Sequence, residues 1–154
     1  MPKPKLPETL PELAAVSEED TSGLQPIQAA WDDVFAEMRR AFAALDYARA
    51  VDLGERFVEK NPDHASARLF LQECRTLLEH RLERELMPLD RVVYARVKLA
   101  ELTKSRVEPR MAFLLAQVDG QTTIEDLVDL AGMPRVDALR TLADAISRGL
   151  VALR

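Results

Sequence analysis

The sequence predicts a mainly α-helical protein with a small two-stranded sheet near its C-terminus. Three observations support this fold class. Apolar residues recur at spacings of three and four over most of residues 27–86, the period of a helix face. Proline and glycine divide residues 108–149 into short helices. Two short apolar segments, 92–99 and 150–153, flank these helices and have the composition of strands.

Composition narrows the class of protein. The chain has 154 residues, a formal net charge of −5 and one cysteine, Cys74. This length suits one domain or two small ones, and a single cysteine excludes a disulfide framework within the chain. No apolar run reaches the ~18 residues that a membrane span needs, and the N-terminus lacks the apolar centre of a secretory signal. We therefore expect a cytoplasmic bacterial protein with no insertion into a membrane.

Residues 1–28 are acidic and rich in proline, and we expect a disordered tail. They hold five of the nine prolines and the acidic run Glu18-Glu19-Asp20. Proline removes a backbone donor and stops helices, and such a segment has little apolar surface to bury. Within it, the string LPETLPELAAV at 6–16 is a candidate docking motif or a single helical turn.

Residues 29–87 carry the clearest helical pattern. The pair Asp46-Tyr47 interrupts the pattern, and Asn61-Pro62 closes it, because proline disfavours the helical conformation of the residue before it. The sequence thus predicts an αα-hairpin, followed by a third, longer helix over 65–86. The apolar face of the first helix comprises Trp31, Val34, Phe35, Met38, Phe42 and Leu45.

The segment 31–64 resembles one tetratricopeptide repeat. The matching residues are Asp46-Tyr47 at the turn, Ala50 three residues later, and Asn61-Pro62 at the end. The family prefers Leu-Gly where this chain has Glu37-Met38, and no second complete repeat follows. Because a lone repeat cannot bury its apolar face, we expect this unit to pack on another part of the protein.

The resemblance implies a groove that binds another protein. Carried over by position, its lining would be Phe35, Arg39, Phe42, Leu69, Glu73 and Thr76. Aromatic residues and arginine are effective interface anchors, and Arg39 with Arg40 suits an acidic peptide or a C-terminal carboxylate. The alternative is that Phe35 and Phe42 are core residues.

Residues 88–154 predict a strand, three helices and a second strand. Residues 92–99 alternate, which places Tyr94, Arg96 and Lys98 on an exposed side. A helix over 92–102 is the alternative. The segment 150–153 is the candidate partner strand, and an open edge on 92–99 would accept a strand from another protein.

Turn and cap residues mark the three helices. Pro109 and Pro134 fit helix starts, and Gly132 and Gly149 fit helix ends. Thr122 and Glu125 have the spacing of a capping box, in which the threonine hydroxyl and the glutamate each accept a backbone N–H.

Residues 113–153 resemble a bacterial winged-helix-type domain of the kind found in PqqD-like proteins and in C-terminal modules of signalling proteins. The residues that carry the resemblance are Asp119-Gly120, the segment 123–127, and the ending Gly149-Leu150. It implies a fold and does not fix a function. In a DNA-binding relative the second helix, here 134–148, would enter the major groove.

On that helix, Arg135 and Arg140 are the candidates for contact with guanine or phosphate. Asp137 and Asp144 share the outer face, and no segment of the chain is strongly basic. A nucleic-acid surface normally clusters lysine and arginine. The sequence therefore disfavours nucleic acid as the partner.

No set of residues predicts catalysis. His80 and Glu83 have one helical spacing used in di-iron bundles, but no second Glu-x-x-His motif is present, and Cys74 fits a buried thiol. We expect no catalytic residues, no metal and no cofactor. The prediction is a non-enzymatic bacterial adaptor or regulatory protein that binds another protein, in signalling, polarity or motility, with homo-oligomers left open. The alternative is a transcription regulator that binds DNA through Arg135 and Arg140.

Overall fold

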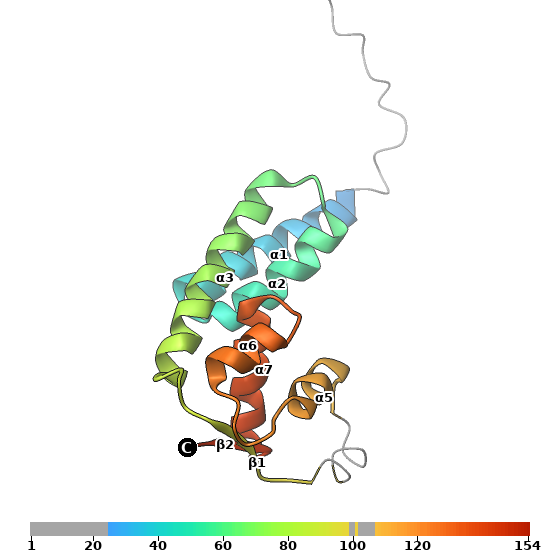
Figure 1. Ribbon diagram of the computed structural model, residues 1–154. Helices are drawn as coiled ribbons and strands as arrows, with labels where there is room; N and C mark the ends of the chain where they lie inside the picture. The colour runs from blue at the N-terminus through green and yellow to red at the C-terminus, as the bar shows by residue number, and fades with distance from the viewer. Residues whose placement is uncertain (1–24, 99–100, 102–106) are drawn as a thin grey trace, which may run out of the picture.

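The computed structural model describes residues 25–98, 101 and 107–154 (Figure 1). The mainly helical class with a small two-stranded antiparallel sheet is confirmed. Most of the predicted tail, residues 1–24, lies outside the described residues. The elements are α1 (Gln25–Ala43), α2 (Tyr47–Lys60), α3 (Ala65–Leu86), β1 (Val93–Ala95), α5 (Pro109–Ala116), α6 (Ile124–Leu130), α7 (Arg135–Ser147) and β2 (Val151–Leu153).

α1 and α2 form the predicted hairpin, and the turn between them is a Schellman motif. The N–H of Asp46 donates to the carbonyl of Ala41, and the N–H of Leu45 donates to that of Phe42, both at 2.9 Å. The Asp46 side chain then caps α2 by accepting the N–H of Arg49 at 3.1 Å. Leu45 was predicted on the apolar face of the first helix, and this is wrong: α1 ends at Ala43, and Leu45 has a φ of +61°.

α3 connects the two halves of the chain. Its N-terminus is capped by His64, whose Nδ1 accepts the N–H of Ala67 at 3.1 Å. The helix packs against both α2 and α7, so it runs from the hairpin to the C-terminal helices (Figure 1). The predicted units 29–87 and 88–154 therefore meet along this helix.

A single hydrophobic core extends through both halves. Its buried residues run from Met38 of α1 through Cys74 and Leu82 of α3 to Leu139 of α7 and Val151 of β2. α7 is central to it, because Val136, Ala138, Leu139, Leu142 and Ala145 are all buried. The two halves thus form one packed body, which removes the difficulty that each alone would bury little surface.

β1 and β2 pair antiparallel in the register Val93 with Leu153, as the pairing of 92–99 with 150–153 predicts. β1 is shorter than predicted and ends at Ala95. Its other edge is covered at Val93, whose N–H donates to the carbonyl of Thr122 at 3.0 Å. This part of 92–99 is therefore not an open edge for a partner strand.

The cap of α6 differs from the predicted capping box by one residue. The cap is Thr123, whose Oγ1 accepts the N–H of Asp126 at 3.2 Å. Thr122 instead donates its hydroxyl to Asp119 Oδ1 at 2.8 Å. Two backbone N–H groups also bind that carboxylate, from Gln121 and Thr122, and together these hydrogen bonds lower the pKa of Asp119.

Gly54 allows the close approach of the first three helices. A Cβ atom at this position would lie 2.6 Å from Met38 Cε and 2.9 Å from Leu71 Cδ1. We expect Gly54→Val to lower the free energy of unfolding by about 2 kcal/mol through overpacking. Gly54→Ala is the matched control, because its better helix propensity of about 1 kcal/mol offsets the smaller clash with two flexible side-chain ends. Urea unfolding of both variants measures this; equal midpoints for valine and glycine would contradict it.

Candidate functional site

The two phenylalanines of the predicted groove belong to an aromatic cluster between α1, α2 and α3. The Phe35 ring lies 5.3 Å from Phe57 and 6.2 Å from Phe70, centroid to centroid. The Phe42 ring lies 4.9 Å from Phe70 and 5.7 Å from Tyr47. Both rings are half-buried, so most of the surface that they would offer a partner already packs against other rings.

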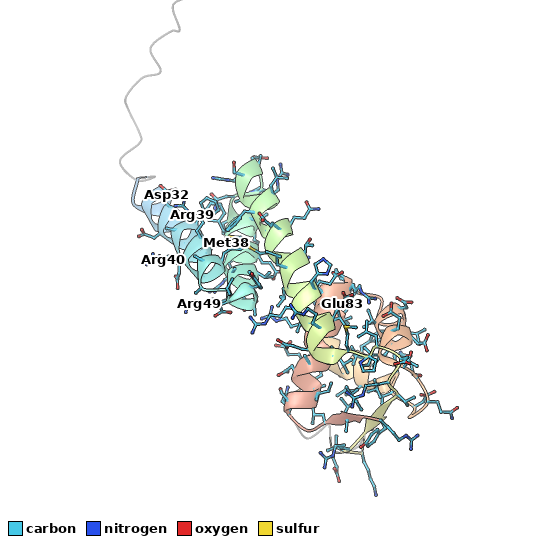
Figure 2. The ribbon with its side chains drawn as sticks, turned by 90° about the vertical axis from the view of Figure 1, so that its left-hand side faces the viewer. Asp32, Met38, Arg39, Arg40, Arg49 and Glu83 are labelled. Atoms are coloured by element: carbon cyan, nitrogen blue, oxygen red, sulfur yellow. The ribbon has the colours of Figure 1, made fainter. Side chains whose placement is uncertain are left out.

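The other four predicted groove residues are exposed, but they divide between two helices. Arg39 lies on α1 (Figure 2), with its guanidinium 5.4 Å from the centre of the Phe35 ring. Leu69, Glu73 and Thr76 lie on the solvent face of α3, and Thr76 donates its hydroxyl to the carbonyl of Gln72 in its own helix. The structure thus brings Phe35, Arg39 and Phe42 together and places the remaining three on a separate stripe.

The two arginines considered for DNA contact are partly exposed and pair with carboxylates of other helices. Arg135 forms a two-pronged pair with Glu125, at 3.0 and 2.8 Å, and its Nε donates to Glu83 at 2.8 Å. Glu83 lies near the end of α3, where that helix reaches the C-terminal helices (Figure 2). The hydrogen bonds that Arg135 donates lower the pKa of Glu125, and those that it donates to Glu125 and Glu83 raise the pKa of the arginine itself.

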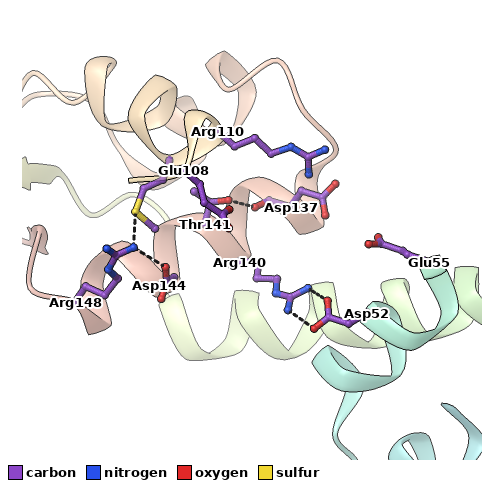
Figure 3. Close-up of a pocket in the computed structure, with 10 residues that line it drawn as sticks. Asp52, Glu55, Glu108, Arg110, Asp137, Arg140, Thr141, Asp144 and Arg148 are labelled. Atoms are coloured by element: carbon purple, nitrogen blue, oxygen red, sulfur yellow. Dashed lines mark hydrogen bonds and ion pairs between the residues drawn. The ribbon is translucent and has the colours of Figure 1, made fainter. Parts of the chain in front are cut away.

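Arg140 forms the second link. Its two terminal nitrogens donate to the two carboxylate oxygens of Asp52 on α2, at 2.7 and 2.9 Å (Figure 3). These hydrogen bonds raise the pKa of Arg140. α7 is therefore tied to α3 by Arg135 and to α2 by Arg140, across 52 and 88 residues of sequence.

The Arg140 pair borders a cleft of about 590 Å³ between α2, α5 and α7 (Figure 3). The charged groups lining it are Asp52, Glu55, Glu108, Arg110, Asp137, Arg140, Asp144 and Arg148. Carboxylates outnumber guanidinium groups, and Arg148 lies 3.5 Å from Asp144. Such a lining repels phosphate and does not suit a nucleic-acid backbone.

A second groove has a different character. It lies where the α1–α2 turn meets α3, has a volume of about 560 Å³, and is hereafter the Leu45 groove. Leu45, Tyr47 and Leu77 supply its apolar surface. Its polar rim comes from α3 and consists of His80, Arg81, Arg84 and Glu85.

The rim of the Leu45 groove carries excess positive charge. Arg81 donates to the carbonyl of Leu45 at 2.9 Å and pairs with Glu85 at 3.0 Å, so its charge is balanced. Arg84 is exposed and forms no ion pair or hydrogen bond with the part of the chain that the structure describes. His80 is exposed and has one weak contact, 3.8 Å from Glu83.

Leu45 is the residue that the sequence reasoning misplaced, and it is 60% exposed. The spacing of three from Phe42 continues the helix pattern, which led to its placement on the apolar face. A signal was available: Leu45 directly precedes Asp46, the cap of α2, and so occupies the turn position where glycine or asparagine is usual.

A smaller apolar pocket lies between α5 and the α6–α7 turn. It is lined by Pro109, Arg110, Phe113, Ala131, Gly132, Met133 and Pro134. Phe113 is 49% exposed, and Arg110 is the single charged residue of the lining. We call it the Phe113 pocket; it is apolar but carries little charge to select a partner.

The described residues hold no group of three histidine, cysteine, aspartate or glutamate side chains placed to bind a metal ion. Cys74 is fully buried in α3, and burial raises the pKa of its thiol to about 11.

Among the described helices none is both long enough and apolar enough to cross a bilayer. Comparison with protein families, with curated proteins and with solved structures finds nothing that this chain matches.

Proposed function

We propose that this protein is a non-enzymatic adaptor that binds an acidic, leucine-containing segment of another protein in the Leu45 groove. The observation that carries the proposal is Leu45 itself. Its side chain is 60% exposed and its backbone has a φ of +61°. Both features are unfavourable for folding, and the residue that has them lines a groove.

The backbone cost is specific to the residue type. A non-glycine residue in the left-handed region costs roughly 1 kcal/mol or more, and leucine lacks the short polar side chain that lets asparagine adopt it. An exposed leucine also keeps apolar surface in water. A strained residue whose side chain lines a groove is the kind of outlier from which a binding role is inferred.

The rim indicates the chemistry of the partner. Arg84 and His80 border the apolar surface from the α3 side, while Arg81 fixes the turn by its hydrogen bond to the Leu45 carbonyl. A leucine side chain matches the floor, and carboxylates match the rim. The expected ligand is therefore a short segment in which leucine and acidic residues are interleaved.

The alternative, DNA binding through Arg135 and Arg140, has less support. Both guanidinium groups are held by carboxylates of the protein itself, and the helix that would enter the major groove has a buried face against the core. DNA would have to displace Glu125, Glu83 and Asp52, which are negative like the phosphates it brings.

Affinity capture from nuclease-treated bacterial lysate tests the proposal. Leu45→Asn keeps the left-handed turn accessible, and Arg84→Glu reverses the free charge. Leu69→Asn is the control, because Leu69 is a similarly exposed leucine that lies outside the Leu45 groove, on the α3 stripe predicted from the sequence. We expect wild type and the Leu69 variant to retain the same protein, and both groove variants to lose it at least tenfold.

Two results oppose the proposal. Loss of the partner with Leu69→Asn alone would assign binding to the stripe of Leu69, Glu73 and Thr76. Recovery of nucleic acid before nuclease treatment, with retention that falls steeply as salt rises, would favour DNA binding instead.

A further inference from the structure

We propose that the N-terminal segment 6–13 of this chain occupies the Leu45 groove of the same molecule and competes there with the partner. The inference rests on the proposed function, since it assigns a second ligand to the same groove. Three features of the molecule support it: the chemistry of the segment, its reach, and the charges around the groove compared with those around the Phe113 pocket.

The segment has the composition that the groove selects. Leu6, Leu10 and Leu13 are interleaved with Glu8 and Glu12. Between positions 6 and 20 the chain has five acidic residues and no lysine or arginine. Leucine side chains suit the floor of Leu45, Tyr47 and Leu77, and the glutamates suit Arg84 and His80.

The segment is long enough to reach the groove within one molecule. α1 begins at Gln25, and Leu45 lies just past the opposite end of this 19-residue helix. A helix of that length spans roughly 28 Å. The twelve Cα-to-Cα steps from Leu13 to Gln25 span up to about 40 Å when the chain is extended. The tether therefore covers the length of α1 and holds the segment near the groove at an effective concentration on the order of millimolar.

The Leu45 groove is a better match for the segment than the Phe113 pocket. The Phe113 pocket has one basic residue, Arg110, in an otherwise uncharged lining. In the Leu45 groove the charge of Arg81 is balanced by Glu85, so Arg84 is the guanidinium group left without an ion pair among the described residues, and His80 adds a polar side chain. Arg110 also lines the neighbouring cleft that holds the carboxylates Glu55, Glu108 and Asp137. An acidic segment therefore meets less repulsion at the Leu45 groove, while both sites offer apolar surface.

Occupation by the segment lowers the affinity for the partner. The apparent dissociation constant rises by the inverse of the fraction of molecules whose groove is empty. If the segment occupies the groove in nine-tenths of the molecules, its removal raises partner affinity about tenfold. The double substitution Leu10→Asp with Leu13→Asp removes two of the three leucines without shortening the chain.

Paramagnetic relaxation in the full-length protein tests the inference. A nitroxide is attached at Thr9→Cys, which spares every leucine and glutamate of the segment. The buried Cys74 has a pKa of about 11 and so little thiolate to react, and labelled wild type measures any background. We expect amide signals of residues 77–85 to broaden, and the broadening to disappear with Leu45→Asn or with Leu10→Asp and Leu13→Asp.

The outcomes separate this inference from the proposed function. Unbroadened amides in residues 77–85, or broadening around Phe113 in their place, would overturn the inference. Docking between copies is detected by mixing ¹⁵N-labelled protein that lacks the nitroxide with nitroxide-labelled protein at natural isotope abundance. Broadening of the ¹⁵N signals in this mixture would also overturn the inference. If Leu45→Asn loses the captured partner while no broadening occurs, the proposed function stands and the inference fails. If broadening depends on Leu45 but capture of the partner does not, docking of the segment stands and the proposed function fails.

Discussion

Leu139→Ala is expected to lower the free energy of unfolding by about 3 kcal/mol and to destabilise the α1–α2 hairpin as much as the C-terminal helices. Leu139 is completely buried on α7, in the core that continues into α3 and α1. Truncation leaves a cavity in this shared core. Because the two halves pack on one another, neither keeps its full stability when the other is loosened.

The single tryptophan allows this to be measured. Trp31 lies on α1, 6.2 Å from the Phe57 ring, and so its fluorescence reports on the hairpin alone. Urea unfolding of Leu139→Ala should shift the midpoint by fluorescence and by far-ultraviolet circular dichroism equally. Leu130→Ala, at an exposed position of α6, should change the free energy by less than about 0.5 kcal/mol. An unmoved fluorescence midpoint in Leu139→Ala would show two independent domains instead.

The second large effect is expected at Arg135. Arg135→Ala should lower the free energy of unfolding by about 2 kcal/mol, because it removes a cation that holds Glu83 and Glu125 together and lies 4.0 Å from Glu79. The three carboxylates then repel one another beside partly buried surface. The groups are partly exposed, and solvent screening keeps the loss below that of a fully buried pair.

A double-mutant cycle with Glu125→Gln isolates the pair energy. Arg49→Ala is the control, since its pair with Glu37 is more exposed and should contribute about 0.5 kcal/mol or less. The effect of Arg135→Ala should also depend on pH. Since the pKa of Glu125 is lowered in the folded state, the pair contributes fully above the ordinary glutamate pKa and loses its contribution as pH falls through the lowered value. Equal stability of Arg135→Ala and wild type at neutral pH would disprove the link.

Local features of the fold are readable in the sequence. The α1–α2 hairpin, its turn at Asp46, and the left-handed Gly132 and Gly149 follow from helix period and turn chemistry within a few residues. The cap at Thr123 was missed because two adjacent threonines both precede acidic residues at capping distance. Which threonine caps α6 depends on where the preceding turn ends. Asp119 keeps Thr122 in that turn by accepting its hydroxyl hydrogen bond.

The partners of Arg135 and Arg140 were not predictable in the same way. On an isolated α7 both arginines face outward and look like candidates for phosphate. Their carboxylates come from α2, α3 and α6, up to 88 residues away in sequence, so only the packing of α7 on the other helices assigns them. The exposure of Leu45 was likewise not predictable from the sequence, because it depends on the residue at which α1 ends.

The central claim is that leucine stands at position 45 for binding and not for folding. The most direct test is the free energy of unfolding of Leu45→Gly compared with wild type, measured with Leu69→Gly in the helix as the matched control. We expect Leu45→Gly to equal or exceed wild type by up to about 1 kcal/mol while losing the captured partner, because glycine adopts the left-handed turn without strain. Leu69→Gly should lose about 1 kcal/mol. A loss at Leu45→Gly as large as that at Leu69→Gly would mean that the leucine stabilises the turn, and the argument for a binding role would fail.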